Sequence, residues 1–179
     1  PHRWAARGLA RTFQNLQIFF NMTAVENVLV GMHLSLDRRL VPALLRLGGV
    51  GRKEMQARAE AEDLLAFVGL EGVADTDADA MSYGALKRLE IARALALKPR
   101  LILLDEPAAG LNPAETARIG TLIRRIAEDG VTVVLVEHDM RLVMGVSDRI
   151  LVIDYGRRLA EGGADEVRSN PDVVAAYLG

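Results

Sequence analysis

Two adjacent acids, Asp105 and Glu106, follow the apolar run "LILL" and precede Pro107. Such a run predicts a buried strand, and ligands of open parallel sheets bind beyond the carboxyl ends of the strands. A carboxylate there can hold Mg²⁺, directly or through water. The next carboxylate, turned toward a nucleophilic water, can act as general base, which is worth about 10²- to 10⁴-fold in rate. The pattern favours a metal and water site for phosphate chemistry over a merely solvated strand end.

A second apolar run, at residues 131–136, leads to His138. If the two strands are neighbours in the sheet, His138 lies near Glu106 and can contact a terminal phosphate. A lone histidine at a strand end is more commonly a structural residue. Its placement relative to the two acids favours the functional interpretation.

Ser82, Tyr83 and Gly84 are predicted to open a helix, with Ser82 as its N-cap. The free N–H groups and positive dipole end of a helix N-terminus suit a phosphate, although a serine cap is also an ordinary structural feature. Gln14, in "RTFQN", could coordinate a metal or relay a signal. Taken alone, it is an ordinary loop glutamine.

Phosphate sites of this type normally include a glycine-rich loop with the pattern G-x-x-x-x-G-K-[ST]. The lysines of the chain are Lys53, Lys87 and Lys98, and none of them follows a glycine. The phosphate loop is therefore absent from these 179 residues.

The elements that position these residues can be predicted from their spacing. Thr23 and Glu26 form a capping-box pattern at the start of a helix over residues 24–34. A second helix lies within residues 52–70, stops at Gly69, and has an apolar stripe of Met55, Ala59, Leu64 or Leu65, and Val68. A third helix follows Ser82, with a stripe of Leu86, Leu89, Ala92 or Arg93, and Leu95 or Ala96. The basic connector at residues 38–51 is interpreted as a solvated loop beside a short helix, with a membrane-surface role as the alternative.

The last part of the chain is predicted to be α/β. Strands are expected within residues 100–107 and 131–139, joined through a helix that begins at Asn112-Pro113 and ends at Gly130. The second strand is expected to be buried on both faces. A short helix within residues 140–148, a hairpin that turns at residues 154–156, and a helix within residues 170–178 complete this part. A strand-helix-strand order implies a right-handed crossover.

Composition excludes several classes of protein. The formal net charge is -2 and there is no long basic run, which argues against a nucleic-acid partner. There are no cysteines, so disulfide frameworks and cysteine zinc sites are excluded. No apolar run approaches the ~20 residues that cross a bilayer. The N-terminus has neither a signal-peptide apolar region nor an initiator Met, as expected of a chain that begins inside a longer protein.

The segments "RTFQN", "MSYGALKRLEIARAL", "LILLDEPAAGLNP" and "VVLVEHDM", in this order, resemble the nucleotide-binding domain of ABC transporters. With the ending "NPDVVAAYLG", they look most like the ATP-binding subunits of branched-chain amino-acid importers. The resemblance covers essentially the whole chain. It implies an α/β fold of the P-loop NTPase type, in which a parallel sheet with flanking helices carries a helical subdomain. The Walker A loop and the adenine-stacking aromatic would precede Pro1, so the fold would be N-terminally truncated.

The resemblance implies a role for each matching residue. Gln14 matches the glutamine that touches Mg²⁺ and faces the transmembrane partner. Asp105 matches the Walker B aspartate, which also serves Mg²⁺, and Glu106 the catalytic glutamate. His138 matches the switch histidine, which holds the γ-phosphate of ATP.

Two further motifs would act across a head-to-tail dimer. Ser82, Tyr83 and Gly84 match the signature motif, which binds the γ-phosphate of ATP held by the other subunit. Tyr83 replaces the usual first glycine, and Ala85 stands where Gln or Glu is expected, so a polar contact to the nucleotide is in doubt. The D-loop falls on Gly110, Leu111 and Asn112, where Asn112 replaces the more common Asp.

The resemblance also implies organisation and partners. Residues 1–36 would be a remnant of the ATPase core, residues 37–98 a helical subdomain ending in the signature helix, and residues 99–179 the rest of the core. The protein would hydrolyse Mg-ATP as a homo- or heterodimer with transmembrane permease subunits, in the cytoplasm on the inner face of the cell membrane. Without Walker A, the chain is expected to turn over little ATP. The alternatives are a non-catalytic module that docks on a membrane partner and a lipopolysaccharide-export-type ATPase.

Overall fold

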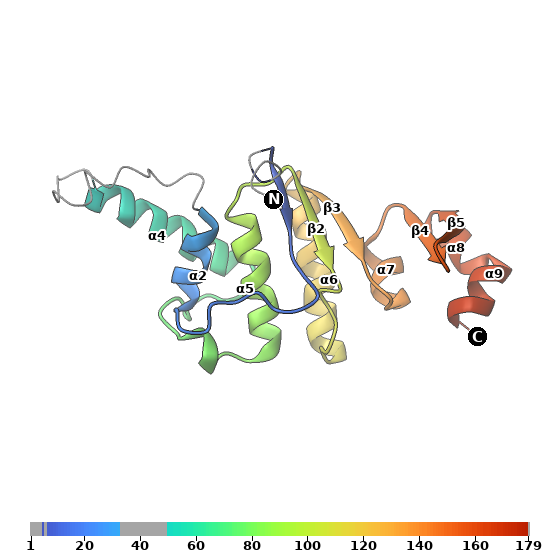
Figure 1. The fold of residues 1–179 in the computed structure, drawn as a ribbon, viewed down its shortest axis with the longest axis horizontal. Helices are drawn as coiled ribbons and strands as arrows, with labels where there is room; N and C mark the ends of the chain where they lie inside the picture. Colours follow the sequence, from blue (N-terminus) through green and yellow to red (C-terminus); the bar gives the residue numbers. More distant parts are fainter. Residues whose placement is uncertain (1–4, 6, 33–49, 179) are drawn as a thin grey trace.

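The computed structural model describes residues 5, 7–32 and 50–178 of the chain. Its main sheet has three parallel strands in the order β1-β2-β3 (Figure 1). β2 is the central strand, with Leu101 paired to Leu9 of β1 and to Thr132 of β3. Because the strands are parallel, the residues that follow them meet at one edge of the sheet. The strands are β1 (Leu9–Arg11), β2 (Leu101–Asp105) and β3 (Thr132–Val136).

Helix α6 (Pro113–Glu128) makes the predicted crossover between β2 and β3. Asn112 caps it, and its Oδ1 accepts hydrogen bonds from the backbone N–H groups of Ala114 and Glu115. In Figure 1, α6 lies behind the sheet. Its buried face joins the core that contains Ile102 and Leu104 of β2, through Ile119, Leu122, Ile123 and Ile126.

Helix α5 (Tyr83–Leu95) begins after Ser82, as predicted, and the Ser82 hydroxyl accepts a hydrogen bond from the backbone N–H of Ala85. Its N-terminus lies at the same end of the molecule as the carboxyl end of β2 (Figure 1). The predicted apolar stripe is confirmed by the burial of Leu86, Leu89, Ala92, Leu95 and Ala96.

Helix α2 (Ala24–Gly31) has the predicted capping box between Thr23 and Glu26. It packs against both α5 and α4. The contact with α5 requires a glycine, because a Cβ at Gly31 would lie 2.2 Å from the backbone oxygen of Arg93. The expected end of this helix, at residues 33–34, lies outside the described residues.

Helix α4 (Val50–Phe67) forms where a helix was expected, and Gly69 follows it with a φ of 72°. Two members of the predicted stripe were wrong: Met55 is 68% exposed, and Ala59 is exposed as well. The buried face of α4 consists partly of alanines instead of the larger side chains predicted. The reason is that α4 packs closely against α2 and α5, where alanine fills the space. This face consists of Ala57, Ala61, Leu65 and Val68.

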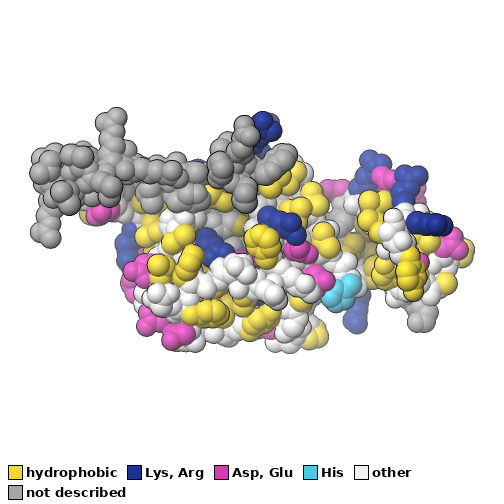
Figure 2. Space-filling view, viewed as in Figure 1, with side chains coloured by type: hydrophobic (Ala, Val, Ile, Leu, Met, Phe, Trp, Pro, Cys, Tyr) yellow, Lys and Arg dark blue, Asp and Glu magenta, His cyan; other side chains and the backbone are white. Residues whose placement is uncertain are grey.

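Strand β3 differs from the expected strand, which was to be buried on both faces. Val134 is 41% exposed and Val136 is 50% exposed. The physical reason is that α6 packs against one face of β3, while Thr132, Val134 and Val136 alternate along its other face. Among the described residues, β3 is also an edge strand, paired to β2 alone. Figure 2 shows patches of hydrophobic side chains on the face of the molecule turned to the viewer.

The C-terminal part forms a separate lobe at one end of the molecule (Figure 1). It follows α7 (Met140–Val146) and contains an antiparallel hairpin of β4 (Ile150–Asp154) and β5 (Arg157–Gly162). The hairpin turns where predicted, with positive φ at Tyr155 and Gly156, as tight hairpin turns require. Three short helical segments follow: α8 (Ala164–Ser169), which was not predicted, α9 (Pro171–Val173), and a π-helix, η3 (Val174–Leu178).

Most of the basic connector, residues 38–49, lies outside the described residues, and its last two residues begin α4. A single 3₁₀ turn, η2 (Ala78–Ala80), precedes the Ser82 cap.

Candidate functional site

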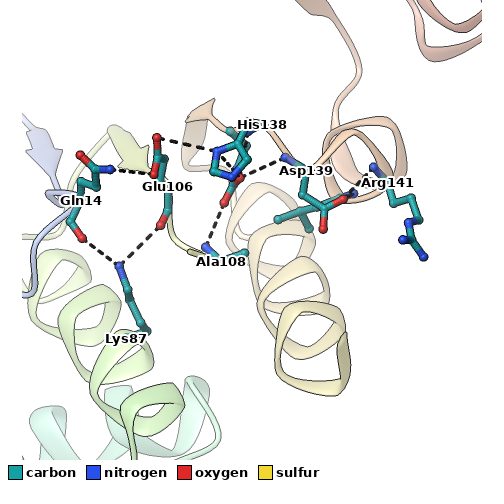
Figure 3. Close-up of polar contacts among 9 residues, drawn as sticks. Gln14, Lys87, Glu106, Ala108, His138, Asp139 and Arg141 are labelled. Atoms are coloured by element: carbon teal, nitrogen blue, oxygen red, sulfur yellow. Dashed lines mark hydrogen bonds and ion pairs between the residues drawn. The ribbon is translucent and has the colours of Figure 1, made fainter. Parts of the chain in front are cut away.

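The structure brings Gln14, Glu106 and His138 together at the carboxyl edge of the sheet (Figure 3). The side-chain amide of Gln14 donates to the Glu106 carboxylate, with an Nε2–Oε2 distance of 2.9 Å. The Nδ1 atom of His138 lies 3.8 Å from the other carboxylate oxygen of Glu106, Oε1. Three segments that are far apart in the sequence therefore meet at one carboxylate.

Glu106 has an unusual backbone conformation, with a φ of 46°. Residues other than glycine rarely adopt positive φ, and such strain is concentrated at functional sites. Its backbone N–H donates to the carbonyl of Val136 over 2.9 Å, which ties the residue to the end of β3. This backbone turns the chain sharply after β2 and places the carboxylate between Gln14 and His138.

Asp105 and the neighbouring Glu106 have different partners, and Asp105 is paired with Arg11. Its Oδ2 lies 2.9 Å from the guanidinium of Arg11 in β1, in a partly exposed ion pair. The hydroxyl of Thr12 accepts a hydrogen bond from the backbone N–H of Asp105 over 3.3 Å. The Asp105 carboxylate therefore lies at the carboxyl end of β2, next in sequence to Glu106, but it is paired to Arg11 and not to Gln14 or His138.

The oxygen donors at this edge suit Mg²⁺, which binds one or two carboxylates and fills its other positions with water and phosphate oxygens. Asp105, Glu106 and the amide oxygen of Gln14 are the donors available. No group of three or more acidic or histidine side chains is placed to hold a metal ion within the described part of the chain. A metal here would thus depend on additional ligands from water and nucleotide.

The N-terminus of α5 lies against the turn that precedes α6. A Cβ added at Gly84 would lie 2.4 Å from Oε1 of Glu115, so only glycine fits there without moving that carboxylate. The ring of Tyr83 lies over Gly110, where an added Cβ would come within 3.2 Å of it. The structure thus joins the predicted helix-start residues to the predicted turn.

The remaining predicted residues flank this contact. Ser82 is exposed and caps α5, whereas Asn112 is exposed and caps α6. Leu111 is half-buried and packs on the main core. These three residues do not contact the Gln14–Glu106–His138 cluster in any hydrogen bond or ion pair of the described residues.

Glu137 belongs to the site but was not predicted from the sequence. Its side chain is only 1% exposed. Its carboxylate accepts hydrogen bonds from the backbone N–H groups of Ala108, His138 and Asp139. It therefore ties the chain after Glu106 to the strand end that carries His138. The sequence feature that could have identified Glu137 is an acidic residue between an apolar strand and His138.

Lys87 and Glu90 of α5 were also not predicted, although both are buried. Lys87 was considered only as a residue that fails the phosphate-loop pattern. Burial raises the pKa of the Glu90 carboxyl above its usual range, although hydrogen bonds from the backbone N–H groups of Gln17 and Phe13 and the charge of Lys87 act against this. Burial likewise lowers the pKa of Arg93, against the charge of Glu90. The sequence signal was two charged residues within an otherwise buried helical stripe.

Comparison with protein families gives matches over both ends of the chain. The sequence profile of ABC transporters matches residues 1–109. The profile of the branched-chain amino acid ATP-binding cassette transporter matches residues 157–179.

Curated relatives extend this similarity over nearly the whole chain. The high-affinity branched-chain amino acid transport ATP-binding protein BraF of Pseudomonas aeruginosa is 46% identical over 179 residues, which are 99% of this chain and 70% of BraF. LivG of Escherichia coli K12, with the same description, is 44% identical and covers 98% of this chain and 69% of LivG. The lipopolysaccharide export system ATP-binding protein LptB of Acidithiobacillus ferridurans is 36% identical and covers 99% of this chain and 68% of LptB.

Solved structures share the fold. The ADP conformation of MJ1267, an ATP-binding cassette of an ABC transporter, has a TM-score of 0.80 and 32% identity, over 100% of this chain and 71% of that one. The dimeric post-hydrolysis state of the ATP-binding cassette MJ0796, bound to ADP and phosphate, has a TM-score of 0.70 and 28% identity, over 87% and 62%. These neighbours confirm the predicted α/β cassette with a parallel sheet and flanking helices.

Within the described residues, no helix is long and apolar enough to span a bilayer. Fold, profile matches and relatives all lead to one assignment. The chain belongs to the ABC transporter family: it is an ATP-binding domain of the ABC ATPases, homologous to the branched-chain amino acid transport ATP-binding proteins BraF and LivG.

Proposed function

We propose that the chain is part of the ATP-hydrolysing subunit of an importer for branched-chain amino acids. The observation that carries this proposal is the meeting of Gln14, Glu106 and His138 at the carboxyl edge of the sheet. The identities of 46% with BraF and 44% with LivG, against 36% with LptB, favour import of these amino acids over lipopolysaccharide export.

In this proposal Glu106 polarises the water that attacks ATP, and His138 holds the γ-phosphate. Gln14 contacts Glu106 directly and His138 lies close to its carboxylate, so both can orient it. Asp105 and Gln14 would hold Mg²⁺, which would neutralise charge on the phosphate oxygens. Rate enhancement in such sites comes mainly from positioning and from stabilisation of phosphate charge.

The helix start at residues 82–84 and the turn at residues 110–112 act together in the proposed dimer. Their mutual contact, through Tyr83 and Gly110, supports a role for both at one subunit interface. We propose that Ser82, Tyr83 and Gly84 bind the γ-phosphate of ATP held by a second ATPase subunit in head-to-tail orientation. The turn at Gly110, Leu111 and Asn112 would lie across that interface.

The three regions 1–36, 37–98 and 99–179 are proposed as core remnant, helical subdomain and core. The helical region would face permease subunits near Gln14, on the cytoplasmic side of the membrane. Without a G-x-x-x-x-G-K-[ST] loop within the 179 residues, this chain is expected to bind ATP weakly when isolated.

The test compares the isolated chain with the complete gene product that contains it. We expect the complete product to hydrolyse Mg-ATP, and Glu106→Gln to lower its turnover by about 10²- to 10⁴-fold while ATP binding persists in calorimetric titration. Glu128→Gln, an exposed change on α6, is the matched control and should leave turnover unchanged. If the complete product binds no ATP, the alternative of a non-catalytic module docking on a membrane partner gains support.

A further inference from the structure

Lys87 is buried in the middle of the molecule, with only 2% of its surface exposed. It lies one helical turn after Tyr83 in α5, and its Nζ atom lies 5.8 Å from the centroid of that ring. Burying an ammonium group costs free energy unless it is hydrogen-bonded, so an apolar residue would fill this position at lower cost. The burial of a lysine therefore requires a reason in what its ammonium binds.

The ammonium donates to two main-chain carbonyl groups. Its Nζ atom lies 3.1 Å from the carbonyl oxygen of Gln14 and 3.5 Å from that of Glu106. Figure 3 shows the Lys87 side chain rising from α5 to a point between these two residues. The two residues whose carbonyls it binds are the same two whose side chains form the 2.9 Å hydrogen bond.

Glu106 needs such support more than most residues, because its φ is 46°. A non-glycine residue persists in this conformation only when its surroundings hold it. Its backbone N–H donates to the carbonyl of Val136, and its carbonyl accepts hydrogen bonds from Lys87 over 3.5 Å and from the backbone N–H of Ala109 over 3.2 Å. Contacts on both sides of its α-carbon thus oppose relaxation of the strained backbone.

Glu90, one turn further along α5, contacts the same loop after β1, but as a hydrogen-bond acceptor rather than a donor. It is 3% exposed, and its Oε1 accepts a hydrogen bond from the backbone N–H of Gln17 over 3.4 Å. One face of α5 therefore holds the Gln14 carbonyl through a cation and the nearby Gln17 N–H through a carboxylate.

We propose that Lys87 is a positioning residue, whose ammonium fixes the Gln14 and Glu106 carbonyls relative to each other so that their side chains meet. Its importance for turnover rests on the proposed function, in which Gln14 and Glu106 act on ATP. Because Lys87 belongs to the helix that Ser82 begins, its hydrogen bonds link that helix to Gln14 and Glu106.

The hydrogen bonds can be tested in the unmodified protein, because the chain has only three lysines. With ¹⁵N in the lysine side chains, nuclear magnetic resonance should detect the Lys87 ammonium near neutral pH, since its protons are shielded from water. The ammonium of Lys98 pairs with Glu60 on the surface, on a side chain that is 66% exposed, and should lose its signal through exchange. Lys53→Arg and Lys98→Arg assign the signals. Equal exchange at Lys87 and Lys98 would overturn the proposal.

Substitution tests the consequence for the two loops. Lys87→Met keeps the chain length of the side chain and removes the donors, and Lys98→Met is the matched control. We expect faster backbone hydrogen exchange in residues 12–17 and 105–109 for Lys87→Met alone. In the complete gene product, kcat should fall by about 10-fold with an unchanged KM for ATP, and Lys87→Arg should restore most of it.

Unchanged exchange in both segments of folded Lys87→Met would contradict the proposal. If Lys87→Met does not fold, Lys87→Arg and the ammonium signal of the unmodified protein still decide it. If the complete product shows no ATP hydrolysis at all, the proposed function fails, whereas the exchange and ammonium measurements continue to report on the positioning role.

Discussion

The side-chain amide of Gln14 is hydrogen-bonded to the carboxylate of Glu106 at 2.9 Å, across 92 residues of sequence. This contact joins the loop after β1 to the end of β2. Because His138 lies near the other carboxylate oxygen, Glu106 is flanked by an amide donor and an imidazole. Movement of the loop that carries Gln14 would therefore change the hydrogen bonding of the proposed catalytic carboxylate.

Replacing Gln14 should disturb the placement of Glu106. Gln14→Ala removes the amide whose Nε2 atom lies 2.9 Å from the Glu106 carboxylate. In the complete gene product, kcat should fall by about 10- to 100-fold, because the carboxylate is then misplaced. Steady-state kinetics measures this loss, with Glu128→Gln as the exposed control. An unchanged kcat for Gln14→Ala would contradict this account.

The sequence predicted those parts of the fold that depend on local patterns. The capping box of α2, the Ser82 and Asn112 caps, and the turn at Tyr155-Gly156 each require only a few neighbouring residues. The order of strand, helix and strand was sufficient for the parallel crossover between β2 and β3. It also brought His138 to the side of Glu106.

The errors and omissions arose where tertiary packing decides. An apolar strand has the same pattern whether one face or both are covered, so the exposure of Val134 and Val136 could not be predicted. In α4 the stripe was predicted from large side chains such as Met55, but close helix packing selects alanine. A lysine in a helix is normally expected to face solvent. The burial of Lys87 depends on the backbone carbonyls of residues 14 and 106, which are distant in the sequence.

Glu137 should contribute measurably to stability. Its buried carboxylate accepts three backbone N–H groups, at Ala108, His138 and Asp139. Glu137→Ala would leave these donors without their acceptor, at a cost of about 1–3 kcal/mol in the free energy of unfolding. Urea denaturation measures this loss, with Glu128→Ala as the exposed control. Equal unfolding midpoints for the two variants would show that water replaces the Glu137 carboxylate fully.

Glu90 should make stability depend on pH in a defined direction. Burial raises its pKa in the folded state above the ordinary value of 4.5, against the effect of Lys87 and Arg93. The folded state therefore binds the proton more tightly, and this contribution is fully present below pH 4.5 and is lost as the pH rises through the folded-state pKa. Each unit of difference corresponds to about 1.4 kcal/mol.

The measurement is the free energy of unfolding at several pH values for the unmodified protein and for Glu90→Gln. The difference between the two isolates Glu90 from the other titrating groups. We expect the unmodified protein to lose stability relative to the variant as pH rises above 4.5. Glu128→Gln should give a difference that does not change with pH in this way.

Gly84 and Glu115 should behave as one unit. A Cβ at residue 84 would lie 2.4 Å from Glu115 Oε1, while Glu115 Oε2 accepts the backbone N–H of Asn112 at the start of α6. Gly84→Ala should therefore displace the flexible Glu115 side chain and destabilise the protein mainly through the lost capping box, by about 0.3–1.5 kcal/mol. Glu115→Ala alone should cost about the same, for the same reason.

The double variant separates this clash from a general intolerance of side chains at residue 84. Once the Glu115 carboxylate is removed, the new methyl group has room, so Gly84→Ala should add little further loss. The double variant should thus be more stable than the sum of the single changes predicts, by about 0.3–1.5 kcal/mol, the contribution of the capping box that both single changes remove. Urea denaturation of all four proteins measures this coupling energy. Strict additivity would mean that the two residues do not contact each other, and the joint between the N-termini of α5 and α6 would then have to rest on Tyr83 and Gly110 alone.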